Sequence, residues 1–345
     1  MGNIISNPSV YTGDEKSKRK RLMEFLPYVS EDHQEELANI DGYYILGDKD
    51  MAEIDVVKTF GDNPGTVADL HELARNSQPV CFDGLKVISN KTVNTQLSMG
   101  HHLQMGKRDR NVYRLNLTYL RDMNVHPLTG ESLSEVVAEL DSRGGFCAGM
   151  NQFLSKRLRC KSSMTFAYEG LQHYQMIADL LGRDYTLSCM LSDLIPYQKT
   201  GIFVASYLKH VTPRLELGWE IIMQPSNEPN LFSCVGRYTR GPCHLSATVN
   251  SNAAELCYTQ TFGGCLRAGT QIQANFVKRS LLAKIYYHMA RPETDFNFRG
   301  GIDTRGVISA TCEKHLKPLP MILVISAKLN HRSNRFRLGV GVVLE

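Results

Sequence analysis

The feature that most constrains this sequence is a strict alternation of apolar and polar residues, which is clearest at the C-terminus. Every second residue from Phe336 to Leu344 is apolar, and the alternate positions from Arg335 to Gly341 hold arginine or glycine. Successive side chains of an extended strand point to opposite faces, so this segment has one apolar and one polar face. The apolar face must contact either a protein core or lipid.

The same period of two recurs in most segments after residue 82. Examples are 113–119, 158–168, 215–223 and 266–276, and clusters of Gly, Pro, Asn or Asp separate such segments. We count about 19 segments of about 9–12 residues, close to the length that a tilted strand needs to cross a bilayer. An open sheet of that size would curl or split, and only a closed barrel satisfies every backbone group within lipid. We therefore predict an all-β fold, a closed transmembrane β-barrel of about 19 strands.

The polar faces of these segments carry many charges, such as Arg159, Glu216 and Arg267. A wide barrel directs such residues into a water-filled lumen and the apolar face toward lipid. A soluble β-sandwich would show the same alternation with the opposite orientation, so the pattern alone leaves both open. The number and length of the segments favour the barrel.

Composition excludes several other classes. The net charge of +4 comes from scattered residues with no basic stripe, so we expect no nucleic-acid partner. The nine cysteines include no C-x-x-C pair, and Cys243-His244 and His101-His102 lack ligand spacing, so we expect no metal. No nucleophile or phosphate loop accompanies the histidines, and we predict neither an enzyme nor a cofactor.

The N-terminal part divides into two segments before a barrel at 81–345. Residues 1–62 are rich in acids and poor in apolar anchors, which predicts a flexible extension. It opens with a pattern that permits myristoylation of Gly2, although an unmodified terminus also fits.

Residues 63–80 contain a short amphipathic helix. Thr66 and Asp69 have the spacing of a capping box, and Leu70 and Leu73 follow at helical spacing. A helix of roughly three turns cannot form its own core, so it must dock on another part of the protein.

Several short stretches, in order along the chain, resemble one family. They are Asn63-Pro64-Gly65-Thr66, Phe82-Asp83-Gly84-Leu85-Lys86-Val87, Ala205-Ser206-Tyr207-Leu208 and Leu316-Lys317-Pro318-Leu319-Pro320. Together they resemble the channel-forming subunits of the protein-import translocase of the mitochondrial outer membrane, within the eukaryotic porin-like superfamily.

The resemblance implies a 19-stranded barrel whose N-terminal helix lies in the lumen and whose first and last strands, near 82–92 and 336–344, pair in parallel. It implies a channel that passes unfolded, presequence-bearing precursor proteins across that membrane. The implied partners are those precursors, an import receptor, small single-helix subunits, the lipid bilayer and further copies of the chain within a complex.

The resemblance also suggests two sets of site residues. Arg337, Gly339, Val342 and Leu344 resemble the C-terminal sorting signal of mitochondrial outer-membrane barrels. Lumenal acids could attract basic targeting helices. The candidates are Glu169, Glu216, Glu220, Asp303 and Glu313. The alternative for each acid is an ion pair with a neighbouring lumenal Arg or Lys.

Two other functions remain open from the sequence. A metabolite and ion pore like the voltage-dependent anion channel would share the strand number, although that family begins its barrel much nearer the N-terminus. A soluble β-rich scaffold would bury its apolar faces instead, and would need no detergent for extraction.

Overall fold

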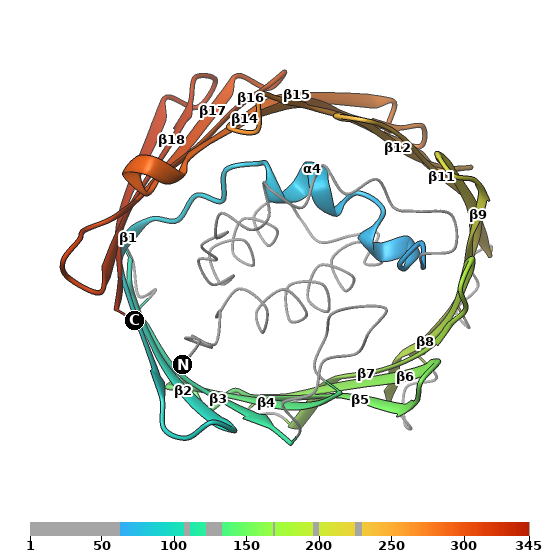
Figure 1. Ribbon diagram of the computed structural model, residues 1–345, viewed down its shortest axis with the longest axis horizontal. Coiled ribbons are helices and arrows are strands. Elements are labelled where there is room, and N and C mark those ends of the chain that lie inside the picture. Colours follow the sequence, from blue (N-terminus) through green and yellow to red (C-terminus); the bar gives the residue numbers. More distant parts are fainter. Residues whose placement is uncertain are drawn as a thin grey trace.

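The computed structural model describes residues 63–106, 111–121, 133–167, 170–195, 200–224 and 230–344. Within them, 19 strands form one closed sheet around a short helical segment (Figure 1). The strands are β1 (Gly84–Thr92), β2 (Leu97–Met105), β3 (Val112–Leu120), β4 (Ser134–Asp141), β5 (Phe146–Ser155), β6 (Leu158–Ala167), β7 (Gly170–Leu181), β8 (Tyr185–Ile195), β9 (Thr200–Thr212), β10 (Leu215–Met223), β11 (Leu231–Arg240), β12 (Cys243–Asn250), β13 (Ala253–Phe262), β14 (Leu266–Asn275), β15 (Ser280–Arg291), β16 (Phe296–Asp303), β17 (Val307–His315), β18 (Met321–Asn330) and β19 (Arg335–Leu344). The helical elements are η2 (Val67–Asp69), α4 (Glu72–Asn76) and η3 (Pro292–Thr294).

The barrel closes by one parallel strand pair. Each strand is antiparallel to the next in sequence, and because their number is odd, β1 and β19 run in the same direction. They pair from Gly84 with Gly339 to Ser89 with Leu344. The predicted closed barrel, its strand number and its parallel closure are therefore confirmed.

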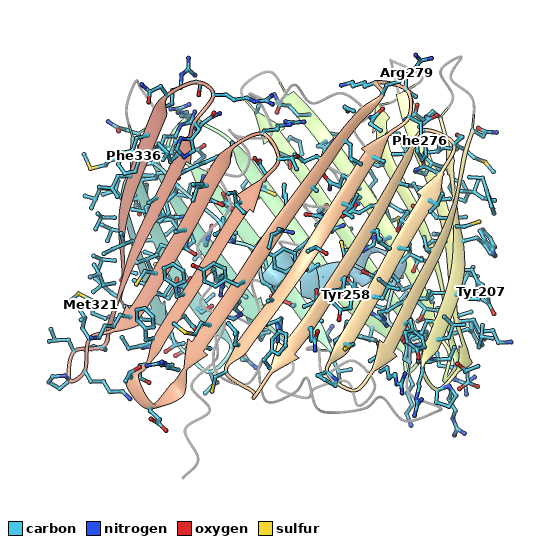
Figure 2. All side chains as sticks on the ribbon, turned by 90° about the horizontal axis from the view of Figure 1, so that it is seen from above. Tyr207, Tyr258, Phe276, Arg279, Met321 and Phe336 are labelled. Atoms are coloured by element: carbon cyan, nitrogen blue, oxygen red, sulfur yellow. The ribbon has the colours of Figure 1, made fainter. Side chains whose placement is uncertain are left out.

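The two faces of the sheet differ as the alternation predicted. Large apolar side chains such as Phe336, Phe276 and Tyr258 are exposed on the outer face (Figure 2). Leu338, Ile272 and Leu217 are exposed as well. Polar and charged residues of the same strands, including Gln271 and Glu216, are buried on the inner face. This distribution is the reverse of a water-soluble protein and fits a barrel surrounded by lipid. None of the helices in the described ranges is long and apolar enough to span a bilayer.

Phe82 covers the inner side of the closing strands. The Ser326 hydroxyl accepts a hydrogen bond from the Phe82 N–H at 3.2 Å and donates one to the Phe82 carbonyl at 2.7 Å. The ring packs over Gly339 and Gly341, and a Cβ added at Gly339 would lie 2.4 Å from the Phe82 carbonyl oxygen. Glycine at 339 is thus required by a close approach of two backbones.

The short helix predicted within residues 63–80 is not continuous, because it divides into η2 and α4. The capping box of Thr66 and Asp69 is present, but it opens the 3-10 helix η2, and α4 begins only after His71. Both ring nitrogens of His71 lie within hydrogen-bonding distance of β12, at 2.8 Å from Ser246 Oγ and 2.9 Å from Thr248 Oγ1. Short helices have little stability of their own, so contacts with the wall decide where they begin and end.

The predictions for residues 1–62, namely a flexible acid-rich extension and acylation of Gly2, lie outside the described residues.

Candidate functional site in the barrel lumen

The inner wall of the barrel is the candidate functional site, because it gathers the polar and charged side chains. Its buried polar residues come from nearly every part of the sheet. They include Asn151, Arg159, Lys161, Gln175, Asp179, Ser206, His210, Glu216, Arg267, Gln271, His288, Arg299 and Glu313. A wall of this composition suits a hydrated passage.

Ion pairs between neighbouring strands organise much of this charge. Arg159 donates to Asp179 Oδ2 through Nε at 3.0 Å and Nη2 at 2.7 Å, directly across β6 and β7. Further pairs join Arg114 to Glu139 at 3.2 Å, Arg237 to Glu216, and Arg299 to Glu313 at 3.7 Å. The lumen wall is therefore of mixed charge, with acids and bases close together.

The predicted precursor-contact acids lie in different surroundings. Glu216 and Glu313 are buried on the lumenal face and paired with arginines, which is the alternative that the sequence left open for them. Glu220 is half-buried on the lumenal face of β10. Asp303 Oδ1 accepts hydrogen bonds from the backbone N–H groups of Arg305 and Val307, in the turn after β16. Glu169 lies outside the described residues.

The lumenal wall also carries acids beyond the five predicted candidates. They are Glu135 and Glu139 on β4, Asp179 on β7 and Glu255 on β13. Each occupies a polar position of its strand alternation, so applying the period of two to every strand would have identified them.

The segment before β1 is fastened to the lumen wall at several points. Asn63 Nδ2 donates to the Gly182 carbonyl at 2.8 Å, and Arg237 donates to the Pro64 carbonyl at 2.6 Å. Leu70 is buried against Leu208 and Val235. These contacts support the predicted lumenal position of this segment (Figure 1).

His71 is a titratable group of this segment. Burial lowers its pKa to about 4, with a smaller lowering from Arg75 and Arg237, while the nearby Glu255 carboxylate opposes the change. The imidazole is therefore neutral at pH 7, with one ring nitrogen donating and the other accepting a hydrogen bond.

Substitution L70A tests the docking of this segment. Leu70 is 2% exposed, and loss of a buried leucine typically costs about 2–5 kcal/mol. We expect L70A to release the segment and to increase protease cleavage between residues 67 and 80 in detergent-solubilised protein. L73A is the matched control, because Leu73 is only half-buried. Equal cleavage of the two variants would contradict this mode of docking.

Cys81 gives a second test of the segment between α4 and β1. Its thiol is directed at the carbonyls of Ala327 and Ala310, 3.4 and 3.8 Å away, and burial raises its pKa from 9.0 to about 11. At pH 7 its thiolate fraction is about 100-fold below that of a thiol with the ordinary pKa. We expect a water-soluble maleimide to modify Cys81 at least about 100-fold more slowly than the exposed Cys265, measured on variants that keep one of the two. Similar rates would show that the segment is undocked in solution.

The predicted sorting-signal residues all lie on β19 at the closure. Gly339 pairs with Gly84, Val342 with Val87 and Leu344 with Ser89 of β1. Val342 and Leu344 belong to the outer, apolar face, whereas Arg337 and Gly339 belong to the lumenal face. The same residues therefore take part in closing the barrel.

Comparison with known proteins assigns the family. Residues 63–339, which include the lumenal segment and nearly the whole barrel, match the model of the eukaryotic porins. The chain belongs to the eukaryotic porin family. Among its relatives, the mitochondrial import receptor subunit TOM40 homolog 2 of Drosophila melanogaster is 33% identical over 82% of this chain and 84% of that protein. TOM40B of Rattus norvegicus is 29% identical over 82% of this chain and 92% of that protein.

This eukaryotic porin groups with the TOM40 subunits, as the sequence resemblance implied. It is a channel-forming transmembrane barrel of the mitochondrial outer membrane with a role in mitochondrial import, and it is not an enzyme. The human TOM40 homolog shares 26% identity over 82% of this chain and 78% of its own length.

Proposed function

We propose that this barrel is a protein-conducting channel that passes unfolded, presequence-bearing precursors across the mitochondrial outer membrane. The observation that carries the proposal is the polar lumen of mixed charge in a chain that is 33% identical to a named mitochondrial import subunit. A moving polypeptide requires many weak contacts with the wall, so that it enters readily and is not trapped.

Paired charges on the wall suit this requirement. Glu216 forms an ion pair with Arg237 through Oε2, and its other carboxylate oxygen, Oε1, lies 3.5 Å from His210 Nε2. A basic passenger helix must compete with Arg237 for this acid, so each contact is weakened and short-lived. Glu220, two positions further along the same face, extends the acidic surface of β10.

The experiment is conductance in a planar bilayer with a basic amphipathic targeting peptide added to one side. We expect reversible block by the peptide and none by a charge-scrambled control. E220Q should raise the blocking concentration about fivefold, since one weak charge contact is worth about 1 kcal/mol. D295N is the matched control, because Asp295 lies between η3 and β16, outside the strands of the barrel wall, and pairs with the exposed Lys317. If the peptide blocked both variants at the same concentration, Glu220 would not contact the passing polypeptide.

An ion and metabolite porin of the voltage-dependent anion channel type is the second candidate, favoured by the match to the eukaryotic porin model. Pores with anion preference and no response to the peptide would support it against the import channel.

The partners follow from the same proposal. Precursors would occupy the lumen, while the import receptor, the small single-helix subunits and further copies of the chain would contact the apolar outer face. Cross-linking from exposed outer positions such as Phe232 and Leu338, in isolated mitochondria, tests these contacts. We propose in addition that Arg337, Gly339, Val342 and Leu344 form the signal read by the assembly machinery of the outer membrane.

A further inference from the structure

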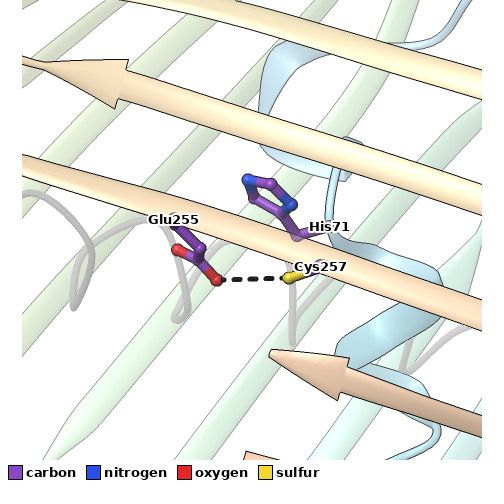
Figure 3. A group of neighbouring side chains, drawn as sticks. All are labelled: His71, Glu255 and Cys257. Atoms are coloured by element: carbon purple, nitrogen blue, oxygen red, sulfur yellow. Dashed lines mark hydrogen bonds between the residues drawn. The ribbon is translucent and has the colours of Figure 1, made fainter. Parts of the chain in front are cut away.

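Three potential metal ligands meet where the lumenal segment contacts β13. His71, at the start of α4, faces Glu255 and Cys257, which are two residues apart and therefore project from the same face of the strand (Figure 3). A ring nitrogen, a carboxylate oxygen and the Sγ atom all lie within 4.8 Å of one another. Cys257 Sγ is 3.7 Å from Glu255 Oε1.

These distances are close to those of a metal centre. Zinc binds imidazole nitrogen and carboxylate oxygen at about 2.0–2.2 Å and thiolate sulfur at about 2.3 Å, which in tetrahedral geometry separates the donors by about 3.3–3.6 Å. The sulfur and the carboxylate oxygen already have nearly this separation. Zinc binding would require the side chains of His71 and Glu255 to rotate, so that the remaining donor separations shorten from the present limit of 4.8 Å. Sulfur and nitrogen donors favour zinc over magnesium or calcium, which prefer oxygen alone.

Neighbouring groups would orient these ligands. Gln271 Nε2 donates to Glu255 Oε1 at 2.6 Å, and Gln78 Nε2 donates to Gln271 Oε1 at 2.7 Å. If one ring nitrogen of His71 bound a metal, the other would keep its hydroxyl partner on Ser246 or Thr248 and hold the ring in place. Hydrogen bonds of this kind to the ligands are a regular part of zinc sites.

The charges can also balance. The positive side chains of Arg75 and Arg237 act on His71 and oppose a cation. On binding Zn²⁺, Cys257 forms the Zn–S bond and releases its thiol proton to solvent. The thiolate and the Glu255 carboxylate together then match the two charges of the ion.

We propose that His71, Glu255 and Cys257 form a zinc site that fastens the lumenal segment to β13. Three protein ligands leave a fourth position for water or for a group of another molecule in the lumen. Occupancy by zinc would make the position of α4 dependent on the metal. The inference is independent of which polymer or solute the channel conducts.

The test uses the full chain, refolded in detergent, reduced and freed of metal. We expect Co²⁺ to produce a thiolate-to-cobalt absorption band, and Zn²⁺ to displace it. C257S should abolish the band, and H71Q should weaken Co²⁺ binding. Q271L should weaken Zn²⁺ binding about 10–100-fold, as loss of an outer-shell partner does.

C147S is the matched control, because Cys147 lies on the lumenal face of β5 and is contacted by Thr165 instead. It should keep the band. Hydrogen exchange over 67–76 should slow with Zn²⁺ in the wild type and in C147S, but not in H71Q. Absence of a sulfur band in folded wild-type protein, or a band that survives C257S, would overturn the proposal. If C257S does not fold, a band of unchanged strength in H71Q would overturn it equally.

Discussion

Substitution D179N should destabilise the barrel by about 3–5 kcal/mol, because it leaves a buried guanidinium without its counter-charge. Arg159 and Asp179 are 4% and 0% exposed, and both Nε and Nη2 of the arginine donate to the same carboxylate oxygen. Denaturant unfolding in detergent micelles, followed by fluorescence of the single tryptophan, measures the loss.

Two controls separate the buried charge from the loss of any carboxylate. Asp295 contacts Lys317 in an exposed ion pair, which holds the pKa of that carboxyl below its usual range, and D295N should cause no measurable change. The double variant R159M/D179L should recover most of the stability, since an apolar pair avoids desolvating two charges. Equal stability of D179N and D295N would show that water in the lumen solvates Arg159, so that the pair behaves like one on the surface.

Substitution G339A should impair barrel closure by about 1–3 kcal/mol, the usual cost of overpacking. The new Cβ would lie 2.4 Å from the Phe82 carbonyl oxygen and 2.7 Å from Ser326 Oγ. The carbonyl belongs to the backbone beside β1 and cannot move without shifting the closing strand pair. Refolding yield and denaturant unfolding in detergent, without any assembly machinery, measure this effect.

Position 341 provides the matched control for closure. A Cβ at Gly341 would meet Phe82 Cζ at 3.1 Å, so a small rotation of the ring relieves the contact, and G341A should lose less stability than G339A. Equal stabilities would show that Phe82 does not restrict the closure.

Import into isolated mitochondria then separates packing from recognition. A G339A barrel that refolds normally in detergent but is not inserted by mitochondria would assign the glycine to the sorting signal alone. Failure in both assays would assign it to closure.

For the two closing strands, β1 and β19, the outer face and the pairing were predictable from the sequence, but the packing was not. The alternation from Phe336 to Leu344 correctly identified the outer face, and the resemblance correctly identified the partner strand at 82–92. The role of Phe82 in requiring glycine at 339 could not be predicted, because it depends on a contact between residues 244 positions apart, Phe82 and Ser326.

In the lumen, likewise, the sequence predicted the face on which a residue lies but not its partner. Alternation places Glu216 on the lumenal face, but its pairing with Arg237 depends on the register of β10 against β11. Likewise, spacing along the chain argued against a metal, because the cysteines include no C-x-x-C pair and the neighbouring Cys243-His244 and His101-His102 lack ligand spacing. His71 meets Glu255 and Cys257 only because the lumenal segment runs along the inner wall past β12 and β13.

By itself, the sequence determined that the chain forms strands, which face of each strand is apolar, and that the sheet must close. These properties are local, because a period of two and a strand length matched to the bilayer act within each segment. The tertiary structure alone decided where η2 ends and α4 begins, which charges neutralise one another, and which side chains meet across the lumen. Those outcomes depend on strand register and on docking of a short segment whose own helical stability is too small to fix its conformation.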